Sequence, residues 1–353
     1  MGAFLRENSY LSGCVQTNSL KSYSNPNAVL SSVHATYPVL IFIPGFGACA
    51  SMYSVLIENL AIKNMTDMVR GKPNDKVDLL IQLHAYYAAG LRYQVTDNGL
   101  QFLEEVTLSG NYKQDFINAA QWAFADNTAD YTMLIIANHG WGILDPQWNA
   151  INQEWEVDEG GLSNSCMIKR GCLNHNDLIK QHKQHRGFMF STSPRVYLNN
   201  QDMADGLTVI RDTILKGKKL DILAFDTCMG DMFEIAYLVG PYAHYLVGNQ
   251  SCSLLDGFDY QGILSVLNQG MAPRTVCRGM VCAFDTYYRK HDDSGIYTHA
   301  ALDLHQIYTV SETLDTVIAH ILNMPELAPL LIQLVMTAPD SVYGQCILIW
   351  SRF

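Results

Sequence analysis

The sequence predicts an α/β fold with a mostly parallel six-stranded sheet and extra helices near the C-terminus. Short apolar runs recur along the chain, and stretches with helical spacing of apolar residues separate them. The runs are apolar at consecutive positions, which is typical of strands buried on both faces. Two of the runs end abruptly in polar residues and glycine, as strands do where the chain turns. Strands that alternate with helices indicate a mostly parallel sheet covered on both sides.

The first half of the chain supplies three of the expected strands. Residues 39–43 form an apolar run that Pro44 ends, and Phe116, Ala120 and Ala123 recur at helical spacing. The expected strands are 39–43, 78–83 and 132–137, and the expected helices are 52–62 and 112–124.

The second half continues the alternation. Residues 220–225 read LDILAF, an apolar run with a single acid, and no helix breaker interrupts residues 232–239. The expected elements are helices at 202–215 and 232–239, strands at 220–225, 245–247 and 300–304, and two helices outside the sheet at 310–322 and 325–336.

The chain divides into a central domain and two flanking segments. Residues 1–36 are rich in Ser and Asn and predict a loose lead-in, whereas residues 323–353 predict a helical extension. The folded domain is expected to span residues 37–322. Residues 143–195 interrupt it with a long polar stretch, and a loop of this length in a compact domain is usually functional or disordered.

The composition excludes several classes of protein. Of the 353 residues, 48% are hydrophobic, which suffices for a full core, and 16% are charged. The net charge of −11 argues against a general nucleic-acid binder and suits a protein that receives basic substrates. No apolar run approaches the roughly 20 residues of a membrane helix. We expect a monomer without a nucleic-acid or membrane partner, either cytoplasmic or exported without a recognisable signal.

Two of the expected strands end in residues that carry chemistry. Cys228 follows the run 220–225, and His139 and Gly140 follow the run 132–137. The carboxyl ends of parallel strands point to one edge of a sheet, so Cys228 and His139 meet if their strands are neighbours. A cysteine nucleophile needs such a base, because the thiolate is the reactive form. The alternatives are a buried, inert cysteine and a histidine that merely lies in a turn.

This pattern resembles the clostripain family of cysteine peptidases, within the caspase-like clan. The phrases that carry the resemblance are FDTCMGDMFEIAY, YAHYLVG, DGFDY at 256–260 and THAALDL at 298–304, with His-Gly earlier in the chain. The similarity covers roughly residues 38–322 and is best from 131 to 262. The chain departs from the family pattern at residues 248–251, Gly-Asn-Gln-Ser, where the family usually has a small residue, Ser and acids.

The resemblance implies a caspase-like αβα sandwich and a role for each site residue. His139 would protonate the leaving amine, and the N–H groups of Gly140 and Cys228 would bind the oxyanion. Asp226 and Asp256 would recognise an Arg or Lys side chain before the cleaved bond. Peptides or proteins with basic residues are therefore the expected substrates. The alternative role of Asp226 is to cap the following helix, and Asp259 is the alternative to Asp256.

The resemblance also implies that the segment between His139 and Cys228 is cut during activation. Lys169 and Arg170, in the sequence Ile-Lys-Arg-Gly, are the expected self-cleavage sites because their Gly-, Ser- and Asn-rich surroundings favour exposure. Lys183, Arg186 and Arg195 are rival sites. The alternative is that residues 143–195 form an ordered lid that is not cut.

No cofactor or metal is expected from the residues themselves. The Cys and His residues at 166–185 match no standard zinc spacing, and the acids at 145–159 match no EF-hand pattern. Calcium remains possible only through the family resemblance. The nine cysteines have no repeated spacing and are expected to be mostly reduced.

Two other functions remain open. Residues 39–60 resemble the first strand and oxyanion turn of α/β-hydrolases, which would make the protein an esterase. That fold requires G-x-S-x-G or a cysteine version of it, and D-x-C-x-G at 226–230 lacks the first glycine. Such an enzyme would take its histidine from His291, His299 or His305. The second possibility is a catalytically degenerate caspase-like scaffold that binds partners.

Overall fold

A computed structural model of the chain defines the fold. It describes residues 10–11, 36–43, 52–84, 89–125, 128–138, 140, 142, 147–149, 154–156, 191–192, 195–196, 198–250, 253–254, 256–291, 297–324 and 330. His139, Lys169 and Arg170 lie outside these residues, as does most of the expected helix at 325–336.

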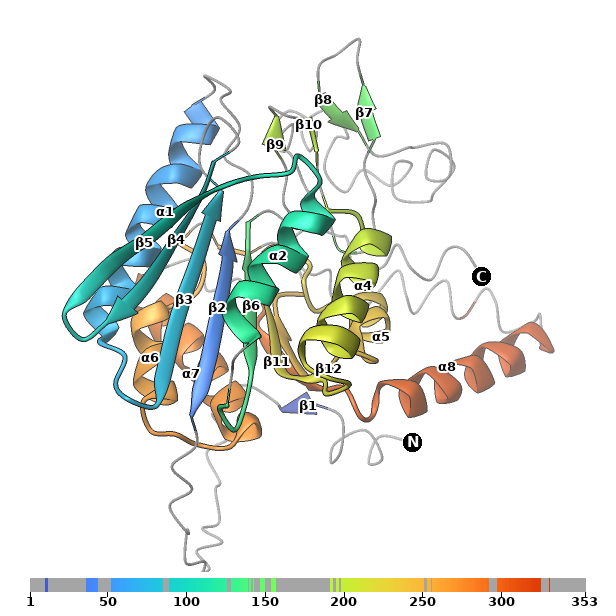
Figure 1. Ribbon diagram of the computed structural model, residues 1–353. Coiled ribbons are helices and arrows are strands. Elements are labelled where there is room, and N and C mark those ends of the chain that lie inside the picture. Colours follow the sequence, from blue (N-terminus) through green and yellow to red (C-terminus); the bar gives the residue numbers. More distant parts are fainter. Residues whose placement is uncertain are drawn as a thin grey trace, which may run out of the picture.

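A mixed nine-stranded sheet crosses the centre of the molecule in the order β1-β13-β12-β11-β6-β2-β3-β4-β5 (Figure 1). The strands along the chain are β1 Tyr10–Leu11, β2 Tyr37–Ile43, β3 Val77–His84, β4 Ala89–Thr96, β5 Gly99–Thr107, β6 Met133–Ala137, β11 Leu220–Asp226, β12 Ala243–Gly248 and β13 Ala300–Asp303.

The prediction of a mostly parallel six-stranded sheet is correct for its centre and wrong for its edges. The five strands β12, β11, β6, β2 and β3 are parallel neighbours. The expected sixth strand, β13, runs antiparallel to β12. Two helices, rather than one, separate β12 from β13, so the chain reverses three times instead of twice and re-enters the sheet in the opposite direction. On the other side, β3, β4 and β5 follow one another without a helix and therefore pair antiparallel.

Helices cover both faces of the sheet, as expected for an αβα sandwich (Figure 1). The helices α1, α6 and α7 pack on one face and α2, α4 and α5 on the other, each against its own apolar core. Their bounds are α1 Met52–Gly71, α2 Tyr112–Phe124, α4 Asn200–Val209, α5 Phe233–Val239, α6 Tyr260–Leu267, α7 Pro273–His291 and α8 Ile307–Leu322, with a π-helical turn η3 Ile210–Ile214 after α4.

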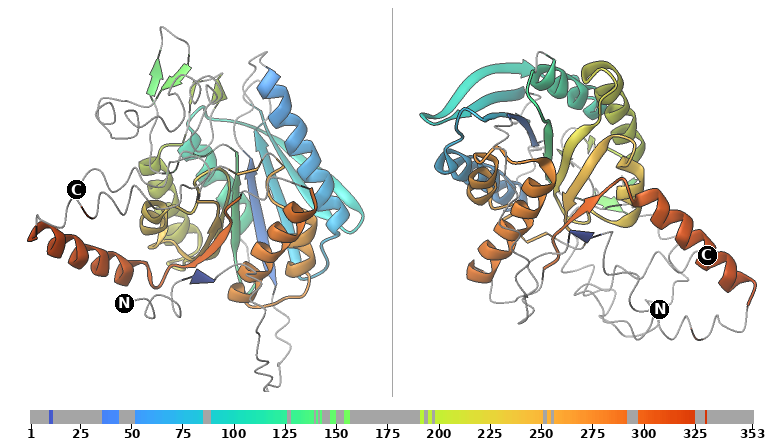
Figure 2. Two further views of the ribbon diagram at one scale, coloured as in Figure 1. Left: turned by 180° about the vertical axis from the view of Figure 1, so that it is seen from behind. Right: turned by 90° about the horizontal axis from the view of Figure 1, so that it is seen from below.

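The helix at 112–124 has the bounds that the spacing predicts, and α8 begins close to its predicted start. The hairpin of β4 and β5 and the helices α6 and α7 are findings that the sequence interpretation did not include. Helix α8 projects away from the sheet in both views of Figure 2. Two small hairpins, β7 Gln147–Asn149 with β8 Glu154–Glu156 and β9 Ser191–Thr192 with β10 Arg195–Val196, lie within the long insertion.

Candidate active site

The strands that carry the two motifs are neighbours in the sheet. β6 pairs in parallel with β11, and Ala137, the last residue of β6, lies opposite Asp226, the last residue of β11. The pairing continues one residue further, because the Asn138 N–H donates to the Asp226 carbonyl oxygen at 3.3 Å. The segments that follow the two strands therefore leave the same edge of the sheet side by side.

Cys228 lies in a tight turn formed by residues 227–231, which we call the nucleophile turn. Met229 has a φ of +56°, a left-handed conformation that is uncommon for a residue other than glycine. Gly230 follows, and a Cβ atom at this position would overlap the Phe225 side chain. The turn thus reverses the chain directly after a buried strand and leaves Cys228 partly exposed.

Gly140 packs directly against the nucleophile turn. A Cβ atom added at Gly140 would overlap the Cys228 carbonyl oxygen and the Thr227 side chain. Only glycine allows the main chain to approach so closely. His139 itself lies outside the described residues, but its neighbours Asn138 and Gly140 both contact the strand end or turn that carries Cys228.

The Cys228 sulfur lies within hydrogen-bonding distance of a second main-chain segment. The Ser253 N–H donates to Cys228 Sγ at 3.2 Å. Ser253 belongs to the connection between β12 and α6, so this connection passes over the nucleophile turn. A backbone N–H is a suitable partner for a thiolate, because it donates a hydrogen bond and brings no proton acceptor.

Asp226 lies beneath the site and is held by the segment 256–260. It is 7% exposed, and its Oδ2 accepts a hydrogen bond of 2.8 Å from the Tyr260 hydroxyl. Burial raises the pKa of Asp226 to about 6, although hydrogen bonds from Tyr260 and from the Phe258 backbone oppose the shift. Gly257, with a φ of +69°, turns so closely over this carboxylate that a Cβ would lie 2.8 Å from Oδ2. Asp226 therefore does not cap the following helix.

Asp256 is more accessible than Asp226 and lies in the same turn as Gly257. Its Oδ2 accepts a 2.7 Å hydrogen bond from the Tyr287 hydroxyl and lies 3.9 Å from Lys63 Nζ, and its side chain is 39% exposed. Asp259 has a different role, because its side chain accepts the Gly262 N–H at 3.0 Å and caps α6. The structure thus brings Asp226 and the turn of Asp256 together and assigns Asp259 to the helix.

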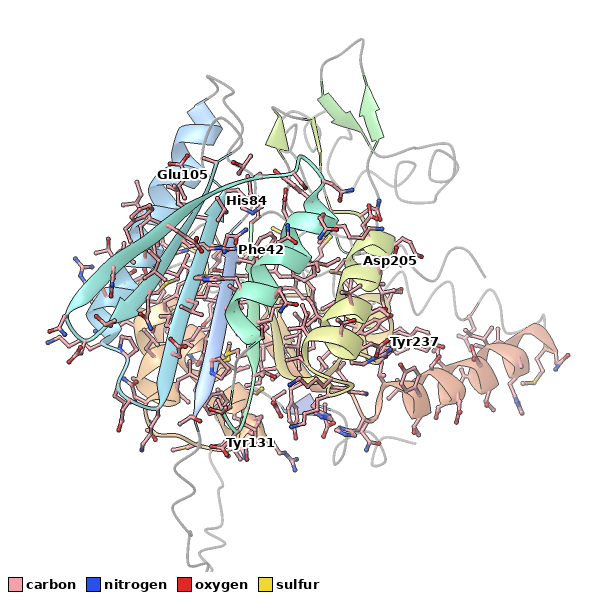
Figure 3. The ribbon with its side chains drawn as sticks, viewed as in Figure 1. Phe42, His84, Glu105, Tyr131, Asp205 and Tyr237 are labelled. Carbon is pink, nitrogen blue, oxygen red and sulfur yellow. The ribbon has the colours of Figure 1, made fainter. Side chains whose placement is uncertain are left out.

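Two described histidines near the sheet, His299 and His84, are not arranged as general bases. His299 stacks on Phe284 with ring centroids 4.0 Å apart, and its Nδ1 lies 3.0 Å from Asn249 Oδ1. His84, at the end of β3, packs edge-on against Phe42 (Figure 3). Burial lowers the pKa of each to about 3, so both imidazoles are neutral.

Two acids after Cys228 were not singled out by the sequence. Asp231 is 1% exposed, and both its carboxyl oxygens are buried with no hydrogen-bond partner in the part of the chain that the structure describes. Burial raises its pKa to about 7. Glu234 is likewise buried at both oxygens without a partner there, and burial raises its pKa as well. No sequence pattern marks an unpaired buried acid, since burial here depends on contacts between distant segments.

The described residues offer no metal site or membrane span. No group of three or more His, Cys, Asp or Glu side chains among them is arranged to hold a metal ion. The residues that the calcium and zinc hypotheses would require lie mostly outside this part of the chain. Cys277 is a buried free thiol. None of the described helices is both long and apolar enough to cross a membrane.

Comparisons with known proteins agree with this geometry. Residues 172–343 match the model of the Clostripain family, peptidase family C11. An inactive zymogen C11 protease from Parabacteroides distasonis has a similar structure, with a TM-score of 0.54 and 18% identity over 80% of this chain and 66% of that one. A comparison with curated proteins finds no significant match.

Two structures from Bacteroides thetaiotaomicron are also similar. One is a secreted C11 cysteine protease in complex with an irreversible peptide inhibitor, with a TM-score of 0.53 and 15% identity over 79% of this chain and 69% of that one. The other, a secreted C11 cysteine protease called iotapain, has a TM-score of 0.54 and 15% identity over 83% of this chain and 73% of that one. This chain spans about two thirds of the length of the zymogen.

The solved C11 proteases therefore share the fold of this chain, and residues 172–343, which include the nucleophile turn, match the clostripain family model.

Proposed function

We propose that this protein is an endopeptidase that uses a His139–Cys228 dyad and cleaves peptide bonds after Arg or Lys. The observation that supports the dyad most directly is the contact between Gly140 and the nucleophile turn. It holds the chain on one side of His139 against Cys228, while Asn138 continues the pairing of β6 with β11 on the other side.

The mechanism follows from this arrangement. The Cys228 thiolate attacks the carbonyl carbon of the cleaved bond and forms a C–S bond, and the carbonyl oxygen becomes an oxyanion. The N–H groups of Gly140 and Cys228 stabilise that oxyanion. His139 then gives its proton to the leaving amine as the C–N bond breaks. Water, deprotonated by His139, hydrolyses the thioester and restores the thiolate.

The preference for basic residues rests on two carboxylates in one region. Asp256 is the more accessible, whereas Asp226 is buried and has a hydrogen bond to Tyr260. Asp256 is therefore expected to contact the guanidinium or ammonium group, with Asp226 beneath it supplying negative potential. Lys63, 3.9 Å from Asp256, is the cation that a substrate side chain would displace or join.

Self-processing is part of the same proposal. Lys169 and Arg170 are basic and lie in the interval between β6 and β11. A cut there would leave His139 on one fragment and Cys228 on the other. The fragments would stay together, because β6 and β11 are neighbouring strands of the sheet. The division into a lead-in at 1–36, a peptidase domain at 37–322 and a C-terminal extension at 323–353 is proposed on the same basis.

A panel of fluorogenic peptides that differ only in the residue before the cleaved bond tests the proposal. The purified chain is assayed before and after prolonged incubation, so that a slow activation is not missed. Arg and Lys peptides should be cleaved and Leu and Asp peptides should not. Cys228→Ala and His139→Ala should each abolish turnover. Ester cleavage that survives Cys228→Ala, or equal cleavage after Arg and Leu, would contradict the proposal.

A further inference from the structure

We infer that Asn249 and His299 act as a positioning pair that orients the Cys228 N–H toward the oxyanion. This inference rests on the proposed peptidase function and adds two residues to it. Neither residue touches the reacting atoms. They act through the main chain of the nucleophile turn.

Asn249 bridges the two ends of the nucleophile turn. It follows β12 directly, on the strand beside β11, and is fully buried. Its side-chain Nδ2 donates to the Thr227 carbonyl oxygen at 3.5 Å, and its own carbonyl oxygen accepts the Asp231 N–H at 3.3 Å. One residue therefore contacts the turn both before and after Cys228.

The contact with Thr227 bears on the oxyanion site through the geometry of one peptide bond. The Thr227 carbonyl and the Cys228 N–H belong to the same planar unit, and in a trans peptide they point in opposite directions. Holding the Thr227 oxygen on the side of Asn249 therefore aims the Cys228 N–H to the other side. The nearby approach of Gly140 restricts rotation of this unit further.

His299 fixes the orientation of the Asn249 amide. Its imidazole is neutral, and Asn249 Oδ1 can only accept a hydrogen bond, so Nδ1 carries the proton and donates at 3.0 Å. With Oδ1 engaged by His299, the amide is held with Nδ2 toward Thr227. A flipped amide would place Oδ1 against the Thr227 carbonyl oxygen, so that two acceptors would face each other.

Two aromatic rings hold His299 in place and connect it to the buried carboxylate of Asp226. Phe284 stacks on the imidazole at 4.0 Å, and Phe258 packs edge-on at 5.1 Å. The Phe258 backbone also hydrogen-bonds to Asp226. The same group of residues therefore supports both the nucleophile turn and the buried acid.

The test separates orientation of the N–H from general stability. His299→Phe keeps a stacking ring and removes the donor, and Asn249→Ser removes the side-chain hydrogen bond to Thr227 while leaving the backbone contact with Asp231. Both variants should lower kcat for an Arg peptide about 10- to 100-fold, with KM changed by no more than about twofold. Alkylation of Cys228 by iodoacetamide needs no oxyanion site, so its rate should change by no more than about twofold.

Asn268→Ser is the matched control. Asn268 also bridges two segments, since it follows α6, accepts the Asn74 N–H at 2.9 Å and donates to the Lys72 carbonyl at 3.0 Å, but its partners precede β3 at the opposite edge of the sheet. The Asn268→Ser variant should leave kcat unchanged. The double variant His299→Phe/Asn249→Ser should match Asn249→Ser alone, because His299 acts through Asn249.

Full turnover in both single variants would overturn the positioning role of Asn249 and His299 without contradicting the proposed peptidase function. Parallel losses of kcat and alkylation rate would also overturn it, because they indicate a distorted turn. If His299→Phe does not fold, the change in kcat relative to the change in alkylation rate in Asn249→Ser decides the question alone. Absence of any Cys228-dependent turnover in the unaltered chain would overturn the proposed function and, with it, the role of the pair.

Discussion

Replacing Asp231 by asparagine should stabilise the protein at neutral pH but not at acidic pH. Asp231 is buried three residues after Cys228, and neither carboxyl oxygen has a hydrogen-bond partner in the described part of the chain. Burial raises its pKa from 3.8 to about 7. Between these values the folded chain holds a proton that the unfolded chain has lost, so stability falls as the pH rises from about 4 to about 7.

The size of the effect follows from the pKa shift. One pKa unit corresponds to about 1.4 kcal/mol, so the shift amounts to roughly 4 kcal/mol as an upper bound. Asparagine has a similar shape and no charge, and it removes this pH-dependent cost. Relative to the unaltered chain, Asp231→Asn should be nearly neutral at pH 4 and more stable by about 2–4 kcal/mol above pH 7.

Urea unfolding at pH 4.5, 6 and 8 measures the difference in midpoint between the two proteins. Asp115→Asn is the matched control, because Asp115 is also buried but its Oδ1 accepts the Ser109 N–H at 2.8 Å. That variant weakens the hydrogen bond from the Ser109 N–H and should destabilise the protein at pH 8. A difference in urea midpoint between Asp231→Asn and the unaltered chain that does not grow between pH 4.5 and pH 8 would refute the reasoning.

Three further predictions concern the site. Gly140→Ala should abolish peptide turnover, because the new Cβ overlaps the Cys228 carbonyl oxygen. Gly110→Ala strains a backbone with a φ of +78° but meets no neighbour within 4 Å of a Cβ, so it should cost stability without abolishing turnover. An active Gly140→Ala enzyme would contradict the packing. Asp256→Asn should raise KM for Arg peptides roughly 30-fold or more, a loss of about 2 kcal/mol in binding free energy. Asp259→Asn removes the same charge but keeps a side chain that can cap α6, so it should leave KM nearly unchanged. Similar KM values for the two variants would show that Asp256 does not bind the basic side chain of the substrate. After incubation of the purified protein, N-terminal sequencing should find a fragment that begins at Arg170 or Gly171 and is absent in Cys228→Ala. A chain that stays whole while fully active would show that residues 143–195 are not an activation linker.

The strand ends were predictable because they depend on local sequence. An apolar run such as 220–225, followed by polar residues and glycine, predicts a buried strand that ends just before Cys228, and β11 does end at Asp226. A single helix between β11 and β12 makes those strands parallel. The direction of β13 was not predictable in the same way, since it depends on the number of intervening helices, and α6 and α7 were not recognised.

The supporting residues of the site were not predictable for a different reason. Asn249 was noted only as a departure from the family pattern, and His299 only as a possible base of another enzyme class. Their contact spans 50 positions in the sequence and becomes visible only when β12 and β13 lie side by side. The choice between Asp256 and Asp259 was not predictable either, because the sequence leaves the two acids equivalent. The structure separates them, since Asp259 accepts the Gly262 N–H and caps α6, whereas Asp256 is partly exposed.

The most direct test of the account is labelling of the intact protein with a peptide electrophile that carries Arg at its reactive end. One molecule should attach per chain, at Cys228, as shown by the mass of the protein and of its proteolytic fragments. An excess of an Arg peptide should slow the reaction, and His139→Ala should slow it strongly. Attachment at Cys277 or Cys282 instead, or labelling at an unchanged rate in His139→Ala, would contradict the assignment of Cys228 and His139 as the catalytic dyad.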